Sequence, residues 1–163
     1  MKTRFIIIMG VSSSGKTTVG KALAERLGWD FYDADDFHPA VNITKMANGI
    51  PLNDDDRRPW LIGLHDRISG CLQEDGSGVL ACSALKESYR QTLLIGNKGV
   101  LIVYLKGDYA LIQERMAKRT GHYMKPAMLQ SQFEALEPPT DALIVDIALP
   151  VAEIVKRIAE ELE

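Results

Sequence analysis

The sequence predicts an α/β fold, in which a five-stranded parallel sheet carries helices on both faces. Three observations lead to this fold class. Short β-rich runs alternate with helix-length amphipathic stretches, which is the pattern of successive β-α-β units. The run Phe5–Met9 is apolar throughout, as expected of a strand that is buried on both faces. The chain has 163 residues, the length of one ordinary domain, so we expect a single domain over residues 1–163.

Each element follows from a local pattern. Strands are expected at residues 5–9, 29–32, 79–82, 100–105 and 142–145. A helix over residues 16–27 has Val19, Leu23 and Leu27 at helical spacing and ends at Gly28. Further helices are expected at residues 59–74, 108–119, 128–136 and 151–163. Residues 33–58 and 121–126 fit the pattern poorly, and long loops in a compact domain are often functional.

Composition and charge exclude several classes of protein. Apolar residues make up 46% of the chain and charged residues 25%, which is typical of a soluble globular protein. The net charge of −3 argues against a nucleic-acid partner, since nucleic-acid-binding domains are usually basic. The apolar run near the N-terminus is too short for a membrane span or a signal peptide. Cys71 and Cys82 form no C-x-x-C pair, so we expect a cytoplasmic protein with free thiols and no membrane partner.

The clearest motif is a phosphate-binding loop at residues 10–17. The string GVSSSGKT matches G-x-x-x-x-G-K-[ST] in full, and it follows an expected strand and opens an expected helix. Backbone N–H groups and the helix N-terminus would hold the phosphates of ATP, Lys16 would reach the β- and γ-phosphates, and the Thr17 hydroxyl would bind Mg²⁺. The sequence therefore predicts a P-loop NTPase fold. Its expected nucleotide-binding residues are Gly10, Val11, Ser12, Ser13, Ser14, Gly15, Lys16, Thr17 and Thr18.

Two carboxylates follow the second expected strand. Asp33 and Asp35 form a D-x-D pair, which points both side chains the same way if the strand continues through it. We expect Asp33 to hold Mg²⁺ through water and Asp35 to face the acceptor hydroxyl. Both could also belong to a solvated acidic loop. Asp146 follows the last expected strand. In small P-loop kinases that strand lies at the sheet edge, away from the metal, so by this analogy we expect Asp146 to be structural.

Two other classes of P-loop protein fit the sequence less well. A GTPase switch reads guanine with N-K-x-D, but Val100 stands in the string at residues 97–100 where the aspartate is needed. The D-x-x-G string at residues 75–78 precedes an expected strand and so indicates a turn. A nucleic-acid-dependent motor usually needs a longer chain and a basic track. A small-molecule kinase remains.

Basic residues supply the other needs of a kinase. Arg115 and Arg119 are four positions apart, so they share one helix face just before residues 120–127, which we expect to form a lid over the phosphates. By analogy with related P-loop folds, in which adenine lies between the lid helix and the loop after the last strand, Arg115 and residues 148–150 are candidates for contact with adenine. The candidate acceptor-binding residues are Asp35, His38, Arg57, Arg58, Lys86 and Arg90. Their basic members suggest an anionic acceptor, although each alone could be a surface charge. The acidic run at residues 54–56 could simply be the first turn of the helix expected from residue 59.

The sequence resembles the gluconokinases of the small P-loop type, which are related in fold to shikimate and nucleoside-monophosphate kinases. The resemblance covers essentially the whole chain. It rests on the phosphate-binding loop and on the strings DADDFHP at residues 33–39, GIPLNDDDRRPWL at 49–61, CSALK at 82–86 and KRTGHYMK at 118–125, with QFE at 132–134. The strings at residues 49–61 and 82–86 are far more specific than the loop itself.

The resemblance implies ATP-dependent phosphorylation of D-gluconate to 6-phospho-D-gluconate, with Mg²⁺, in the cytoplasm, commonly by a homodimer. It also implies the strand order 2-3-1-4-5. By analogy with shikimate kinases, it places Asp35 at the acceptor hydroxyl. Lys16, Asp35 and Arg119 are the expected catalytic residues. Arg57, Arg58, Lys86 and Arg90 remain alternatives for binding the gluconate carboxylate.

Overall fold

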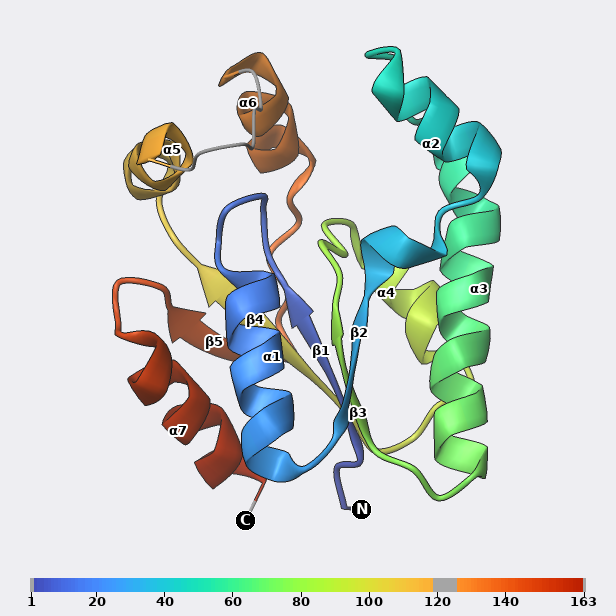
Figure 1. The fold of residues 1–163 in the computed structure, drawn as a ribbon, viewed down its shortest axis with the longest axis vertical. Coiled ribbons are helices and arrows are strands. Elements are labelled where there is room, and N and C mark those ends of the chain that lie inside the picture. Colours follow the sequence, from blue (N-terminus) through green and yellow to red (C-terminus); the bar gives the residue numbers. More distant parts are fainter. Residues whose placement is uncertain (1, 119–125, 163) are drawn as a thin grey trace.

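The computed structural model describes residues 2–118 and 126–162, and in it a parallel sheet separates two layers of helices (Figure 1). The strand order is β2-β3-β1-β4-β5, as predicted. The strands are β1 Phe5–Met9, β2 Asp30–Asp33, β3 Gly78–Ala81, β4 Val100–Lys106 and β5 Leu143–Asp146. The helices are α1 Lys16–Leu27, α2 Ala40–Ala47, α3 Asp54–Gln73, α4 Glu87–Leu94, α5 Tyr109–Lys118, α6 Pro126–Ala135 and α7 Val151–Glu161, with a 3-10 helix, η1, at Ala34–Phe37.

Strand β1 lies at the centre of the sheet and divides the core in two. All five of its side chains are fully buried. Ile6 and Ile8 pack in the cluster that includes the apolar faces of α1 and α7. Phe5, Ile7 and Met9 pack in the other cluster, with residues of α3 and α4. The period of two along a strand therefore explains why this run is apolar at every position.

The carboxyl ends of the strands meet at one edge of the sheet, beneath α2, α5 and α6 (Figure 1). Strand β1 ends at the phosphate loop, β2 ends at η1, and β3 ends at the segment that carries Lys86. In open α/β sheets, ligands bind at this edge. The topology thus brings together the three segments to which sequence reasoning assigned nucleotide and acceptor contacts.

Helix α3 begins five residues earlier than predicted. The side chain of Asn53 accepts a hydrogen bond from Asp56 N at 2.7 Å, and Asp56 Oδ2 accepts one from Asn53 N at 3.1 Å. This reciprocal capping box starts the helix at Asp54, so that Pro59 lies inside it and not at its first position. The acidic run at residues 54–56 is therefore the first turn of the helix, where negative charge is favourable.

Two helices were not predicted as separate elements. Helix α2 lies within the polar stretch at residues 33–58, and its pattern is inverted: Val41, Ile43 and Met46 are exposed while Asn42 is buried. Val41 and Ile43 are two positions apart and so lie on different sides of the helix, which leaves no regular apolar stripe in the sequence. The short helix α4 lies between β3 and β4. Across the described ranges, no helix combines the length and the apolar character needed to cross a bilayer.

Candidate active site

The phosphate loop connects β1 to α1, and two glycines give it its shape. A Cβ at Gly10 would lie 2.6 Å from Ser14 Oγ and 3.1 Å from the Leu105 carbonyl oxygen, so only glycine fits there. Gly15 adopts φ 96° and caps α1. This left-handed conformation favours glycine, and a cap without a side chain leaves the first N–H groups of α1 accessible to a phosphate. The loop thus has the local geometry that the motif predicts.

The charged and hydroxyl groups of the loop lie where α1 begins. Lys16 is the first residue of the helix, and its Nζ donates to the Val11 carbonyl oxygen at 2.9 Å. Thr17 and Thr18 follow on the solvent-exposed side of the first turn. The helix dipole adds positive potential at the same point. This end of α1 is therefore suited to bind an anion.

Asp33 and Asp35 lie beside the loop, but not in the way that the sequence predicts. Asp33 ends β2, whereas Asp35 already belongs to η1, so the strand does not continue through the pair. Instead, Asp33 Oδ1 accepts a hydrogen bond from Asp35 N at 3.0 Å and caps η1. Burial raises the pKa of Asp35, and the negative charge of Asp33 raises it further. The positive charges of His38 and Lys16 lower the pKa of Asp35 and so oppose this shift. Both groups therefore lie close enough to Asp35 to interact with it.

His38 is held flat against the core. Its ring stacks on Trp60 with 4.3 Å between centroids and 10° between planes. Its Nδ1 lies 3.3 Å from Asn42 Nδ2, and because an amide NH₂ can only donate, the neutral ring carries its proton on Nε2. Burial lowers the pKa of His38, and the charge of Arg57 lowers it further, against the opposing charge of Asp35. His38 thus lies within electrostatic reach of both Asp35 and Arg57.

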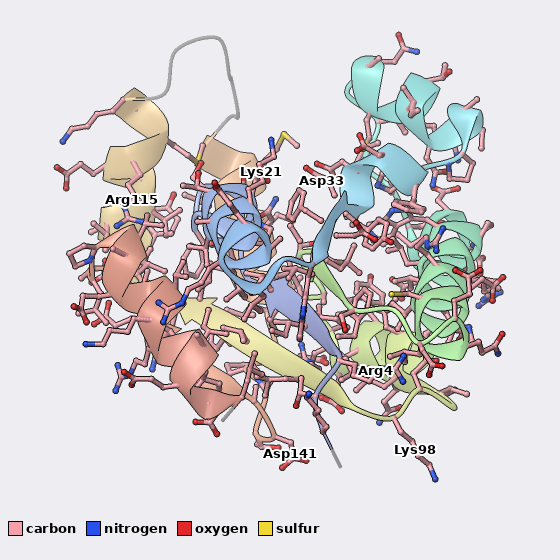
Figure 2. The ribbon with its side chains drawn as sticks, turned by 60° about the horizontal axis from the view of Figure 1, so that its bottom comes forward. Arg4, Lys21, Asp33, Lys98, Arg115 and Asp141 are labelled. Atoms are coloured by element: carbon pink, nitrogen blue, oxygen red, sulfur yellow. The ribbon has the colours of Figure 1, made fainter. Side chains whose placement is uncertain are left out.

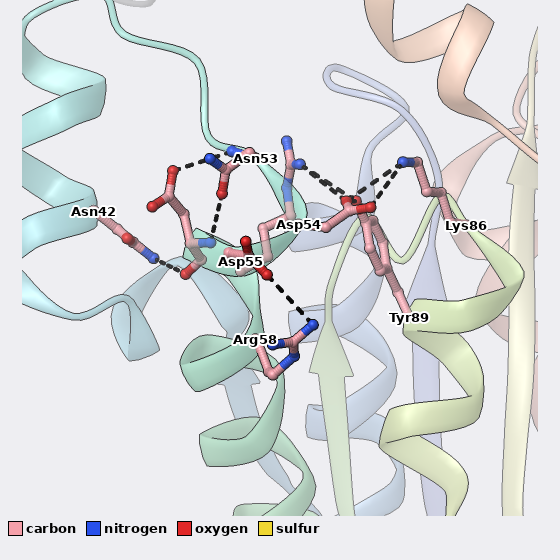
Figure 3. A network of polar contacts seen from close by, with 9 residues as sticks. Asn42, Asn53, Asp54, Asp55, Arg58, Lys86 and Tyr89 are labelled. Carbon is pink, nitrogen blue, oxygen red and sulfur yellow. Dashed lines mark hydrogen bonds and ion pairs between the residues drawn. The ribbon is translucent and has the colours of Figure 1, made fainter.

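Arg57 on α3 and Lys86 at the start of α4 both lie near the carboxylate of Asp54. Figure 3 shows Lys86 and Tyr89 beside this carboxylate. Asp54 accepts from the Tyr89 hydroxyl at 2.5 Å and from Lys86 Nζ at 3.4 Å, and Arg57 Nη1 lies 3.8 Å away. Arg57 Nη1 also donates to the Tyr89 hydroxyl oxygen at 3.3 Å. The hydrogen bonds from Tyr89 and Lys86 lower the pKa of Asp54. Both cations remain about one-third exposed, so a second anion can reach them.

The other two candidate cations do not join this pair. Arg58 is 69% exposed and lies 3.4 Å from Asp55, on another side of α3. Arg90 is buried, and its guanidinium donates to the carbonyl oxygens of Ala84 at 2.7 Å, Leu85 at 3.1 Å and Glu137 at 2.8 Å. The Arg90 donors thus hold the loop that follows β3, and a contact of Arg90 with the acceptor stays a prediction.

Arg115 connects α5 to the segment after β5. Its Nη2 donates to the Ile147 carbonyl oxygen at 2.5 Å, next to residues 148–150, which were the other candidate for adenine contact. Figure 2 shows Arg115 and Asp33 on opposite sides of α1. Arg119 lies outside the described residues. So does the expected lid at residues 120–127, apart from its last two residues, which begin α6.

Three residues of the site have contacts that the sequence does not predict. Asp54 and Tyr89 complete the cluster around Arg57 and Lys86, and Gln132 on α6 contacts the phosphate loop: its Oε1 accepts from Ser12 N at 2.7 Å. Gln132 belongs to the string QFE, which is part of the family resemblance, but that string does not indicate which residue Gln132 contacts. The contact spans 120 positions, so no local pattern predicts it.

Comparisons with known proteins identify the family. The sequence model of the family described as "Shikimate kinase" matches residues 12–162. A probable gluconokinase from Rattus norvegicus is 45% identical, over 97% of this chain and 97% of that protein. The thermoresistant gluconokinase of Escherichia coli (strain K12) is 45% identical, over 91% of this chain and 87% of that protein.

Solved structures give the same result. The crystal structure of a gluconokinase from Sinorhizobium meliloti 1021 is 44% identical and aligns with a TM-score of 0.85, covering 99% of this chain and 97% of that one. The APS kinase of Mycobacterium tuberculosis aligns with a TM-score of 0.70 at 16% identity, a level at which only the fold is shared.

Proposed function

The chain belongs to the shikimate kinase family and, within it, to the gluconokinases, and from this membership we propose that it transfers the γ-phosphoryl group of ATP to D-gluconate. The products are ADP and 6-phospho-D-gluconate. The observation that supports this activity most directly is that the phosphate loop, Asp35, His38 and two partly exposed cations, Arg57 and Lys86, all lie at one edge of the sheet. The charge of Asp35 acts on Lys16 and on His38, and the charge of Arg57 also acts on His38.

On the nucleotide side, the backbone N–H groups of the loop and the N-terminus of α1 hold the phosphates of ATP. Lys16 leaves the Val11 carbonyl and reaches the β- and γ-phosphates, which it can do because its side chain begins at the first turn of α1. Arg115 and the segment after β5 lie on the far side of α1 from Asp33, and we place adenine there. Arg119 completes the proposed catalytic set as a cation over the transferring phosphoryl group.

We propose that Mg²⁺ arrives with ATP. Mg²⁺ usually keeps several waters and binds through one or two protein groups together with substrate phosphates. The residues fit this mode: Thr17 offers its hydroxyl, Asp33 offers a carboxylate through water, and among the described residues no three His, Cys, Asp or Glu side chains form a cage. When bound, the ion neutralises charge on the β- and γ-phosphate oxygens.

On the acceptor side, the carboxylate of gluconate binds Arg57 and Lys86, and its terminal hydroxyl reaches Asp35. The hydroxyl oxygen attacks the γ-phosphorus, the bond to the ADP oxygen breaks, and the hydroxyl proton passes to Asp35. The raised pKa of Asp35 suits it to accept that proton, although positioning contributes more than proton transfer in a loose transition state. The family resemblance further implies a cytoplasmic homodimer, which light scattering and cell fractionation would test.

The experiment that tests the function measures ADP release with Mg-ATP across gluconate, idonate, glycerate, shikimate and nucleoside monophosphates. We expect turnover with gluconate at roughly 1–100 s⁻¹, as is typical of kinases. Turnover with another acceptor alone would keep the phosphate-loop chemistry and overturn the assignment of gluconate. ATP binding without turnover on any acceptor would overturn the proposed activity.

A further inference from the structure

One peptide bond of the phosphate loop is held from both sides. The carbonyl oxygen of Val11 accepts from Lys16 Nζ at 2.9 Å and from Ser14 N at 3.2 Å. The N–H of the same peptide unit belongs to Ser12, and it donates to Gln132 Oε1 at 2.7 Å. In a trans peptide the C=O and N–H point in opposite directions. A partner that fixes the N–H therefore also fixes where the carbonyl points.

Gln132 is well placed to act as that partner, because its helix is anchored on the same side. Leu129, one turn earlier on α6, is fully buried in the core cluster beneath α1. Phe133 packs against Tyr109 of α5, with 5.4 Å between ring centroids. Residues three and four positions apart share a helix face, so Leu129, Gln132 and Phe133 all face inward. The Gln132 side chain thus reaches the loop from a fixed backbone.

We propose that Gln132 is a positioning residue, which sets the orientation of the Val11–Ser12 peptide and, through the Val11 carbonyl, the resting position of the Lys16 ammonium. The Ser12 N–H is then satisfied by the protein, and the phosphate cradle begins at Ser13. Without this acceptor, the peptide could rotate and turn its carbonyl away from Lys16. The loop would then have to be reordered whenever ATP binds.

The chemistry of the contact determines which substitutions test it. A backbone N–H can only donate, so the Gln132 atom that faces it must be the amide oxygen. Methionine has nearly the same length and shape but is a weak acceptor, so Gln132→Met removes the hydrogen bond while filling the space. Glutamate keeps an acceptor oxygen, so Gln132→Glu retains the contact. Gln130 lies on the same helix and bonds to Glu134, which makes Gln130→Met a matched control.

The first measurement is made on the protein without nucleotide. The ¹⁵N–¹H resonance of Ser12 and its hydrogen exchange report directly on the bond to Gln132. We expect Gln132→Met to shift this resonance upfield and to speed its exchange. Gln132→Glu and Gln130→Met should leave exchange at Ser12 as slow as in the wild type. An unchanged Ser12 amide in Gln132→Met would overturn the proposed contact.

The second measurement is the binding of a non-hydrolysable ATP analogue with Mg²⁺. We expect Gln132→Met to weaken binding by about three- to tenfold, the usual effect of losing one hydrogen bond. In turnover, KM for ATP should rise while KM for gluconate stays within twofold, a split that a general loss of structure would not produce. Analogue affinity equal to the wild type, despite an altered Ser12 amide, would overturn the positioning role.

The inference rests on the proposed function only in taking ATP as the nucleotide. Binding of the ATP analogue requires no acceptor. The positioning role of Gln132 can therefore be overturned without overturning the phosphorylation of gluconate, and the reverse. A wild type that binds the analogue, responds to Gln132→Met and yet fails to phosphorylate gluconate would overturn the activity and leave the role of Gln132 intact.

Discussion

Asp35 illustrates how a reactive group can reduce the stability of a fold. Burial and the charge of Asp33 raise its pKa, so the folded protein disfavours the ionised form. At pH values above the folded-state pKa, this carboxylate therefore lowers the free energy of unfolding. Asp35→Asn removes that charge at little change in shape. We expect the variant to unfold at a higher urea concentration at pH 7 and to lose about 10²-fold or more in kcat, the range of general acid–base contributions.

The pH dependence of the stability difference between Asp35→Asn and the wild type tests this effect. The stability gained by Asp35→Asn should be largest at neutral pH and should shrink as the pH falls through the raised folded-state pKa, since below it the wild-type carboxyl is also neutral. In the wild type, kcat/KM should fall on the acid side with a midpoint above the ordinary value of an aspartate. A kcat within threefold of the wild type would remove Asp35 from the reaction.

Arg57 and Arg58 are adjacent in sequence but differ in surroundings, which makes them a natural pair for mutation. Arg57 contacts Tyr89 and lies near Asp54, whereas Arg58 is mostly exposed beside Asp55. We expect Arg57→Met to raise KM for gluconate about tenfold or more, the cost of losing a charged hydrogen bond, with KM for ATP unchanged. Arg58→Met makes the same change in charge and should move neither constant beyond twofold. Equal effects from both would mean that general electrostatic attraction, and not a specific contact, binds the acceptor.

At the scale of elements, the loop after β3 depends on Arg90. Ala84 in this loop adopts φ 45°, a left-handed conformation that is unfavourable for alanine, and its carbonyl oxygen accepts from Arg90. Removing the guanidinium would take this donor from the carbonyl oxygens of Ala84 and Glu137, while that of Leu85 would keep the Glu137 N–H at 2.8 Å. We expect Arg90→Met to lower the free energy of unfolding by about 3 kcal/mol or more, measured by urea denaturation.

Arg90→Lys distinguishes shape from charge at the same position. An ammonium cannot reproduce the planar fork that reaches several carbonyls, so we expect only partial recovery of stability. Arg58→Met serves as the surface reference, with a change within about 0.5 kcal/mol. If Arg90→Met were as stable as the wild type and lost only gluconate affinity, Arg90 would return to the acceptor site.

The elements that the sequence predicts well are those whose signals are local. Strand β1, helix α1 and the loop between them are determined by one apolar run, one helical spacing and one glycine pattern, and all three were found with their bounds. Helix α2 is not predictable in this way because its apolar residues Val41, Ile43 and Met46 lack the spacing of one helix face. Proline is a common first residue of a helix, so Pro59 predicts a start that is too late. The structure starts α3 at Asp54, after the capping box at Asn53.

The site shows the same division between local and distant information. The position of the phosphate loop after β1 and that of Asp33 at the end of β2 follow from contiguous residues, while their binding roles stay predictions. The partners that give the other side chains their roles lie far along the chain: Gln132 from Ser12, Tyr89 from Asp54 and Glu137 from Arg90. A sequence without its fold could name Arg90 as a cation but could not show that backbone carbonyls surround it.

For the molecule as a whole, the central sheet links ligand binding to global stability. The phosphate loop joins β1, which lies in both core clusters, to α1, which packs on β2, β3 and α7. Because the loop continues into the central strand and into a packed helix, unfolding the loop disrupts the core. A ligand held only by the native loop therefore stabilises the folded state. Mg-ATP at 100 times its Kd should raise the free energy of unfolding by about 2.7 kcal/mol.

Lys16→Ala tests whether that stabilisation comes through the phosphate loop. We expect the variant to fold, since Lys16 is partly exposed at the start of α1, but to show no turnover and little rise in unfolding midpoint with Mg-ATP. Lys21→Ala is the matched control. Lys21 lies on the same helix, with its Nζ 5.9 Å from the centroid of the Phe31 ring, so the variant removes an identical charge away from the loop and should keep the full Mg-ATP shift. Differential scanning fluorimetry of both variants, with and without Mg-ATP, measures the difference. An equal shift in Lys16→Ala and in Lys21→Ala would show that the nucleotide binds elsewhere on the molecule.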